Sequence, residues 1–282
     1  MSVESPKSSH PTYNTFMPLA ADRCICLRKS EYSETSQIVT LFSRGHGILR
    51  LIAKGAHRRT KAGASRFDGG IDLLDSGHAV FTGDPAHELG TLTEWKLSEG
   101  HLGLRQNLRA LYLALYAAEL LGMLIEERDP HERAFDALEN LLPPLSTPRR
   151  EEAFLAFELD LLRESGFFPE LAVCVSCSQE PEARGSIGFS PSRGGVVCSR
   201  CESSFPDRIN LDHRLLRLLR QMPAHADPDR LPRLTRHQTD PLNRLLAAHV
   251  EHALGRRLRM PPYILPRGSA KAQPETLCRS EA

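Results

Sequence analysis

Four of the seven cysteines form two short motifs, Cys174-Val-Ser-Cys177 and Cys198-Ser-Arg-Cys201, with twenty residues between them. Each motif can present two thiolates from one tight turn, and two such turns facing each other make a tetrahedral cage of four sulfur atoms. Gly194 and Gly195 stand just before the second motif, which strengthens the pattern. The spacing therefore predicts a zinc ribbon in which all four cysteines bind a structural Zn²⁺.

A zinc ion with four protein ligands has no open position for water, so we expect it to stabilise the fold and not to catalyse. Two alternatives stay open. A pair of disulfides would need an oxidising compartment, and an iron–sulfur cluster also accepts four thiolates, although its usual spacings differ. The other cysteines, Cys24, Cys26 and Cys278, show no disulfide logic, which favours a reducing cytoplasm. We expect Cys24 and Cys26 to share one side of a strand, in a core.

The sequence contains no nucleophile elbow and no glycine loop that would cradle a nucleotide phosphate, so we expect no catalytic residues. A nuclease is the alternative, and the acids that could hold its magnesium are Asp72, Asp75 and Asp84. They alternate with apolar residues, as the outer face of a strand would. His249 and His252 lack a third ligand, and we interpret them as a solvated helix face. A scaffold that reaches nucleic acid only through a partner is a third possibility.

Basic residues are concentrated in one segment, although the net charge of the whole chain is only +1. Residues 22–66 contain ten Lys and Arg against three acids, and residues 67–99 contain seven acids against one Lys. The densest patch is the Gly- and Ala-rich loop 54–63. Its small residues let a phosphate approach the backbone, which favours binding of a phosphodiester chain without sequence readout. The alternative is a solvated loop. The predicted DNA-binding residues are Arg28, Lys29, Arg44, Lys54, Arg58, Arg59, Lys61 and Arg66.

The basic loop lies among five predicted short strands, rich in β-branched residues and separated by glycine turns. They cover residues 23–28, 37–42, 48–53, 71–81 and 88–95. This pattern indicates a small OB-like barrel, a fold that often offers a groove to single strands.

After Gly100 the apolar residues recur with a helical period. We predict helices over 104–124, from Asp129-Pro130 to Pro143-Pro144, over 148–165, from 210 onward, and from 240 to about 259. The stripe formed by Leu111, Leu115, Leu121 and Leu124 is expected in the core, with a groove for a partner's apolar tail as the alternative. The stretch 108–125 contains Arg109 and Glu119, so it is too interrupted to span a membrane.

The predicted fold class is therefore α+β. An N-terminal five-stranded OB-like β-barrel (19–98) precedes an α-helical domain (99–168 and 207–265), into which a four-Cys zinc module (169–206) is inserted. Residues 1–18 are polar and lack the apolar run of a signal peptide, so we expect a disordered extension. Residues 266–282 are expected to form a flexible tail.

The order of these parts resembles the RecO family of bacterial recombination mediator proteins, from about Leu19 to Leu265. The resemblance rests on short blocks that follow one another in the expected order. They read Glu-Thr-Ser-Gln-Ile-Val-Thr-Leu-Phe-Ser at 34–43, Gly-His-Gly at 45–47, Lys-Gly-Ala at 54–56, Phe-Leu-Ala-Phe-Glu-Leu at 154–159, Leu161-Leu162, Gly166-Phe167, and His-Ala-Leu-Gly-Arg-Arg-Leu at 252–258.

The resemblance implies a non-enzymic role in DNA repair, recombination and the DNA damage response. RecO-type proteins bind single- and double-stranded DNA, anneal complementary strands, and help load recombinase onto strands coated with single-strand-binding protein, in the RecF pathway. Their partners are RecR and the C-terminal tail of single-strand-binding protein. The family's DNA surface would fall on Lys54, Arg58, Arg59 and Lys61. Cysteines are not universal in the family, so zinc would support the fold. The implied location is the cytoplasm, at the nucleoid.

Overall fold

The structure is a computed structural model that describes residues 19–56, 67–68, 70–83, 89–182, 186–225 and 227–265. The chain divides into two compact units. The first contains Met1–His101 together with Ile125–Glu139, and the second contains Leu102–Leu124 together with Asn140–Ala282. The predicted N-terminal extension and C-terminal tail lie outside the described residues.

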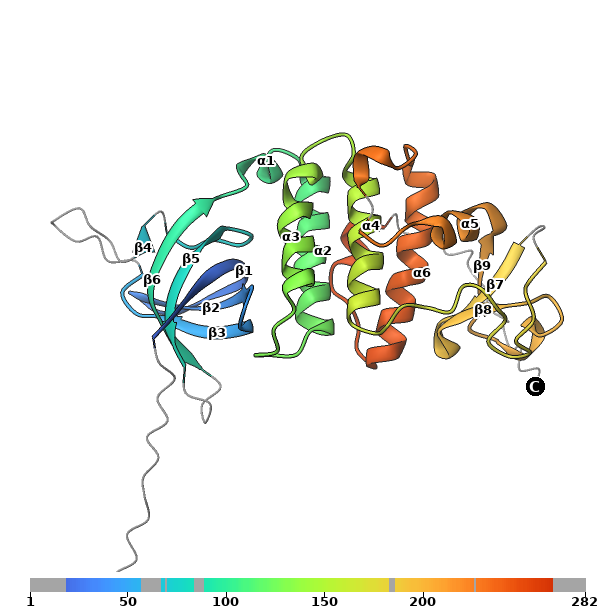
Figure 1. The fold of residues 1–282 in the computed structure, drawn as a ribbon, viewed down its shortest axis with the longest axis horizontal. Helices are drawn as coiled ribbons and strands as arrows, with labels where there is room; N and C mark the ends of the chain where they lie inside the picture. The colour runs from blue at the N-terminus through green and yellow to red at the C-terminus, as the bar shows by residue number, and fades with distance from the viewer. Residues whose placement is uncertain are drawn as a thin grey trace, which may run out of the picture. The chain divides into compact units, whose positions relative to one another are not determined.

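Six strands of the first unit form one sheet that closes on itself (Figure 1). Neighbouring strands run in the order β3-β2-β1-β5-β6-β4, and a parallel pairing of β3 with β6 closes a barrel of five strands. The two-residue strand β4 extends the β6 edge. The strands are β1 (Ala20–Ser33), β2 (Ser36–Ser43), β3 (Gly47–Ala53), β4 (Phe67–Asp68), β5 (Ser76–Thr82) and β6 (Gly90–Glu99).

The barrel interior is filled by alternate residues of each strand, as the two-residue period of a strand requires. Cys24 and Cys26 are fully buried there beside Leu41 and Trp95, which confirms their predicted place in a core. Burial raises the pKa of both thiols, so neither is an activated nucleophile. Gly77 is required at its position, because a Cβ there would lie 2.6 Å from the Trp95 ring.

The segment Ile125–Glu139 covers part of the outer surface of this barrel. Ile48 forms a parallel bridge with Glu127, and the Phe135 ring lies 5.6 Å from the Phe42 ring. Ile25 and Phe42 are therefore fully buried although their neighbours along the strands point into the barrel. A strand with both faces covered reads as a continuous apolar run, as residues 24–27 do.

Three long helices make the framework of the second unit: α4 packs against α2 and also against α6. Their shared core includes Tyr116 of α2, stacked on Phe154 of α4 with ring centroids 5.3 Å apart. Among the described residues, no helix is both long and apolar enough to cross a bilayer. The helices are α1 (Leu102–Arg105), α2 (Leu108–Leu124), α4 (Arg150–Glu164), α5 (His213–Gln221), α6 (Arg236–Leu254) and α7 (Pro261–Ile264), and α3 (Glu132–Leu145) begins in the first unit and ends in the second.

A three-stranded antiparallel sheet, ordered β8-β7-β9, belongs to the cysteine module of the second unit. Short 3₁₀ turns separate its parts. Their bounds are β7 (Ser186–Ser190), η1 (Pro191–Arg193), β8 (Gly195–Val197), η2 (Glu202–Ser204) and β9 (Ile209–Asp212), and η3 (Pro228–Arg230) follows α5. The predicted fold class, an OB-like barrel followed by helices with a four-cysteine module, is confirmed.

Several predicted element ends were wrong. The helix predicted from residue 210 begins at His213, because Asn210 to Asp212 pair with β7 and Asp212 then caps the helix by accepting from the Arg214 N–H. The helix predicted from 240 to about 259 runs from Arg236 to Leu254, since Thr235 and Gln238 form a capping box at its start, Pro241 is accommodated inside it and Gly255 ends it. Helix α3 runs through Pro143 and Pro144 to Leu145.

The prediction that the leucine stripe of α2 lies in the core is confirmed for two of its four residues. Leu121 and Leu124 are buried, whereas Leu111 and Leu115 are half-buried. The buried positions of α2 also include Leu113, Tyr116 and Leu120, so nearly every side of the helix meets protein. A helix that is apolar all round belongs to the interior of a bundle.

Candidate metal site and nucleic-acid interface

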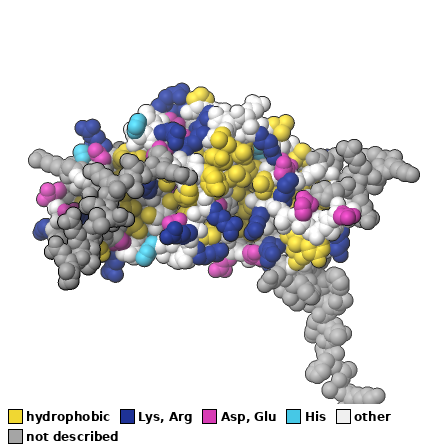
Figure 2. All heavy atoms as spheres, turned by 180° about the vertical axis from the view of Figure 1, so that it is seen from behind, with side chains coloured by type: hydrophobic (Ala, Val, Ile, Leu, Met, Phe, Trp, Pro, Cys, Tyr) yellow, Lys and Arg dark blue, Asp and Glu magenta, His cyan; other side chains and the backbone are white. Residues whose placement is uncertain are grey.

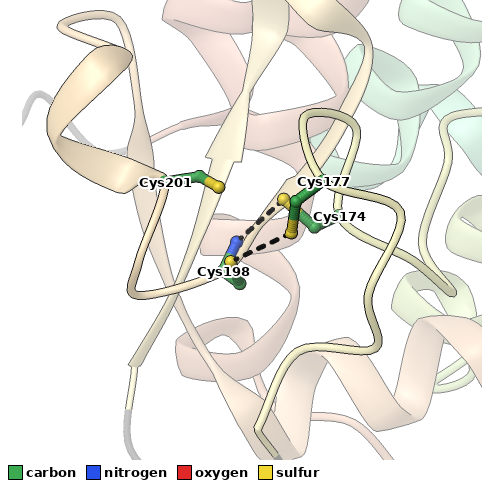
Figure 3. A group of neighbouring side chains, drawn as sticks. All are labelled: Cys174, Cys177, Cys198 and Cys201. Carbon is green, nitrogen blue, oxygen red and sulfur yellow. Dashed lines mark hydrogen bonds between the residues drawn. The ribbon is translucent and has the colours of Figure 1, made fainter.

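Two turns bring the four motif cysteines together. The Ser178 N–H donates to the Cys174 carbonyl at 2.8 Å, and the Cys201 N–H donates to the Cys198 carbonyl at 2.9 Å. Each turn therefore folds its Cys-x-x-Cys motif back so that both thiols point the same way. Figure 3 shows the four side chains converging from the two turns.

The sulfur geometry fits a tetrahedral metal ion. The four Sγ atoms lie within 4.8 Å of one another, and Cys177 Sγ is 3.6 Å from Cys198 Sγ. A tetrahedron with metal–sulfur bonds of about 2.3 Å has sulfur–sulfur edges of roughly 3.8 Å, which these separations bracket. Among the residues that the structure describes, this is the one group of three or more His, Cys, Asp or Glu side chains able to hold a metal.

Backbone amides favour the thiolate form that a metal requires at two of the four cysteines. At Cys201 a hydrogen bond from Ser176 lowers the pKa, but hydrogen bonds with the other three cysteines and burial outweigh it and raise the pKa to about 11. Burial raises the pKa of the Cys174 thiol, but N–H donors of Cys198, Cys177 and Ser176 outweigh burial and lower it to about 6. The Cys198 N–H lies 3.4 Å from Cys174 Sγ (Figure 3). The pKa of Cys198 is lowered as well, because hydrogen bonds from Cys201 and Cys177 exceed the effect of burial. The donor set is therefore suited to a thiophilic cation such as zinc.

Close backbone approach positions the two turns. The Val175 N–H donates to the Val196 carbonyl, and Glu170 and Gly195 form a bridge. A Cβ on Gly195 would lie 2.5 Å from Val175 Cγ1 and 2.6 Å from the Glu170 carbonyl oxygen, so no larger residue fits. The glycine noted beside the second motif thus has a steric role.

The interpretation of His249 as a solvated residue was wrong. Its side chain is buried, its Nε2 lies 2.8 Å from the Phe167 carbonyl oxygen, and its ring meets Phe189 edge-on. Burial lowers the pKa of His249, so the neutral ring is favoured and Nε2 is the donor. Helical spacing placed His249 and His252 on related faces, but only the packing of η1 against α6 buries the first.

Four of the eight predicted DNA-binding residues are described by the structure. Arg28 on β1 and Lys54, directly after β3, are exposed. Lys29 pairs with Asp72 at 2.8 Å. The other four, Arg58, Arg59, Lys61 and Arg66, lie outside the described residues.

Arg44, also predicted to bind DNA, is engaged by two acids of α3. Its Nε and Nη2 donate to the two carboxylate oxygens of Asp136 at 2.9 and 3.0 Å, and Nη1 lies 2.6 Å from Glu132. The Arg44 fork lowers the pKa of Asp136, so the pair stays ionised. The two-pronged geometry of this pair indicates that Arg44 holds α3 against the turn between β2 and β3. The two carboxylates compensate the charge of Arg44.

Arg50 is a cation that the site prediction omitted. Arg28 of β1 is opposite Thr40 of β2, and Thr40 is opposite Arg50 of β3. Residues directly opposite across neighbouring strands point to the same face, so Arg28 and Arg50 stand about 10 Å apart on the outside of the barrel. Both are exposed. The two-residue alternation of Ile48 to Ala53 was the signal that could have identified Arg50.

Two of the acids proposed for the nuclease alternative stabilise a turn before β5. The Asp72 N–H donates to the Asp75 carboxylate at 2.7 Å, and Asp75 is buried. The predicted strand over 71–81 begins only at Ser76, so Asp75 does not stand on an outer strand face. Asp84 lies outside the described residues.

Cationic side chains are divided into groups on the surface. Figure 2 shows Lys and Arg side chains in several separate groups on one face, with hydrophobic and acidic side chains between them. This agrees with the near-neutral total charge of the chain.

A closed OB-like barrel with exposed cations, followed by a helical unit with a four-cysteine cluster, is an architecture suited to nucleic-acid binding. Two family models match nearly the whole of this arrangement. One, described as "Recombination protein O N terminal", covers residues 17–101, and the other, "Recombination protein O C terminal", covers residues 105–261. The chain belongs to the RecO family.

Individual relatives agree. A DNA repair protein RecO from Anaeromyxobacter sp. (strain Fw109-5) is 32% identical over 240 residues, which cover 83% of this chain and 91% of the relative. That of Rhodopirellula baltica is 33% identical over 72% of this chain and 74% of its own length. That of Listeria monocytogenes serotype 4b is 28% identical over 70% of this chain and 74% of its own. The resemblance predicted from the sequence blocks is confirmed.

Proposed function

We propose that this protein is a recombination mediator that binds single- and double-stranded DNA and anneals complementary strands. Membership of a DNA repair family supports the class of ligand. The observation that carries the proposal is the closed barrel with Arg28 and Arg50 in register on its outside and Lys54 at the end of β3. Annealing needs no nucleophile; it needs cations that screen the repulsion between two phosphate backbones while the bases stay accessible.

The proposed DNA surface combines these barrel residues with the loop that follows β3. Arg58, Arg59, Lys61 and Arg66 would add cations from the loop, and Lys29 and Arg44 would contribute less because acids already pair with them. In the cell, at the nucleoid, the protein would help load recombinase onto strands coated with single-strand-binding protein. The proposed partners are RecR and the C-terminal tail of single-strand-binding protein.

Zinc is the proposed metal, held by Cys174, Cys177, Cys198 and Cys201. Four thiolates would fill its coordination sphere, so the ion would stabilise the module and supply no reactive water. The module suits such support, because its own hydrophobic cluster consists mainly of the cysteines with Val175, Val197 and Phe205.

Strand annealing with complementary labelled oligonucleotides, naked and coated with single-strand-binding protein, tests the proposed function. We expect duplex formation faster than the spontaneous rate on both substrates, without added nucleotide. Strands recovered intact after incubation with Mg²⁺ are part of the expected result, because cleavage would instead favour the nuclease alternative. Annealing no faster than the spontaneous rate would refute the proposal.

A further inference from the structure

A cleft of about 680 Å³ opens in the second unit between the cysteine module and the end of α6. The module contributes its two short turns, and α6 contributes its last turn and the residues after it. The residues on which the inference depends are Arg193, Phe205, Asp207, Glu251, Arg256 and Arg257. The cleft is distinct from the barrel surface, since every lining residue belongs to the second unit.

The two acids of the cleft are already engaged by the protein. Asp207 accepts from the Ser190 hydroxyl at 3.0 Å and from the Ser192 N–H at 2.9 Å. Glu251 accepts from the Leu258 N–H at 2.8 Å. Each carboxylate therefore stabilises its own wall of the cleft, Asp207 within the cysteine module and Glu251 at the end of α6.

The three arginines, by contrast, have no side-chain partner among the described residues, and all three are exposed. Three guanidinium groups against two carboxylates leave the cleft with an excess of positive charge, which favours an anionic ligand over a neutral one. One guanidinium group can bind two oxygens of a phosphate group at once. Three arginines therefore suit a ligand that carries several phosphate groups.

Fixed backbone turns set the positions of these arginines. Ser190 caps the η1 turn by accepting from the Arg193 N–H, and Gly194 follows in a left-handed conformation. Gly255 ends α6 with a φ of 61°, while the Arg256 N–H returns to the Glu251 carbonyl. This helix end directs Arg256 and Arg257 out of α6, and it needs no ligand to form.

An aromatic ring beside the cations points to the class of ligand. Phe205 is half-buried against the cysteine cluster, which leaves part of its ring at the cleft wall. Pro191 and Pro206 line the cleft next to it. Cations that follow a backbone, combined with an apolar ring on which a base can stack, are the combination that binds single-stranded nucleic acid. An acidic peptide would use the cations but has less use for the ring.

We propose that this cleft is a second nucleic-acid site, in which Arg193, Arg256 and Arg257 bind the phosphodiester backbone of a single strand and Phe205 stacks on a base. The inference rests on the proposed function for the class of ligand, and it adds a contact in the second unit. Two separate sites would let one molecule hold two strands.

A triple variant, Arg193→Ala/Arg256→Ala/Arg257→Ala, tests the site against a matched control. The control is Arg214→Ala/Arg217→Ala/Arg233→Ala, which removes the same charge from exposed arginines that do not line the cleft. Binding of a labelled 30-nucleotide strand is measured by anisotropy over a range of salt concentrations, with bound zinc quantified in each protein. We expect the cleft variant to bind about tenfold more weakly, with a salt slope reduced by about 2, and the control to lose less than 0.5 of slope. A strand carrying 5-iodouracil should cross-link to the peptide that contains Phe205.

Three other results would overturn the inference. If the parent protein binds DNA and the two triple variants behave alike, the cleft is not a site, although the proposed function stands. If the cleft variant keeps its DNA affinity but loses that for a labelled Asp- and Glu-rich decapeptide, the cleft binds acidic peptides. If the parent protein ignores DNA altogether, the proposed function fails, and the inference fails with it.

Discussion

At the scale of single residues, one buried carboxyl group should make the free energy of unfolding depend on pH. Glu158 of α4 is fully buried, and one of its carboxylate oxygens accepts a hydrogen bond from the Tyr116 hydroxyl at 3.4 Å. Burial raises the pKa of Glu158 to about 8. A carboxyl group in this position is neutral in the folded protein at pH 6, although it is ionised in the unfolded chain, and it ionises in the folded protein only above about pH 8.

Stability should therefore fall as pH rises through the range from the ordinary carboxyl pKa to about 8, because the folded state binds the extra proton. Each pH unit corresponds to about 1.4 kcal/mol for one such group. Urea unfolding of the parent protein at pH 6 and pH 8 should show a loss of roughly 2 kcal/mol. Glu158→Gln should abolish that loss, whereas the exposed Glu126→Gln should retain it. The buried His249 contributes with the opposite sign in both proteins, so the same change between pH 6 and pH 8 in the parent and in Glu158→Gln would contradict the assignment of a neutral carboxyl.

Single-residue roles could be predicted from the sequence only where they depend on nearby residues of the chain. The cysteine spacing was sufficient to predict the cluster, because the turn that brings thiols i and i+3 together is local. Burial of His249 and pairing of Arg44 with Asp136 could not be predicted, because each depends on a residue from a distant element. Arg50 was predictable from strand alternation once its strand was recognised.

At the scale of elements, the segment Ile125–Glu139 behaves as part of the barrel unit. Its helical period was visible in the sequence, but the pattern does not tell which surface an amphipathic helix covers. The consecutive buried residues Cys24 to Leu27 were the available sign that the barrel wall has a second covered face.

Truncation of Phe135 tests whether this cover stabilises the barrel. Phe135 is fully buried against Phe42, so Phe135→Ala should cost roughly 3–5 kcal/mol. The exposed Tyr32→Ala, in the same unit, should change stability by less than about 0.5 kcal/mol. Fluorescence of Trp95, the single tryptophan in the barrel core, reports unfolding of this unit directly. Similar stabilities of the two variants would show that the helix is not needed by the barrel.

The cysteine module is a second element whose stability can be tested by itself. Cys198→Ser removes one of four ligands, so we expect loss of bound zinc and faster proteolysis between β7 and η2. Annealing should decline only as far as the folded fraction declines, since the metal supplies no chemistry. Ser204→Ala, which leaves all four ligands in place, is the control. A metal-free variant that keeps its parent stability but cannot anneal would give zinc a direct role in the reaction.

For the whole molecule, the fold class followed from two local patterns: glycine-punctuated strands and then helical periodicity. The five strands that close the barrel were predicted, whereas β4 and the three strands of the cysteine module were not, and the starts of β5 and α6 differ from the prediction. These differences arise where a cap or a pairing partner decides the boundary. Thr235 with Gln238 defines the start of α6, and β7 recruits residues 209–212 into a sheet.

For the whole molecule, the proposed function requires the barrel to bind phosphodiester chains by charge, without reading sequence. The most direct measurement is the salt dependence of oligonucleotide binding for the parent and for Arg58→Ala/Arg59→Ala/Lys61→Ala, with two unrelated strand sequences. We predict tight binding in dilute buffer and a salt slope lowered by about 2 in the variant, equally for both sequences. An unchanged slope, or a parent protein with its metal bound that fails to bind either strand at low salt, would contradict the account.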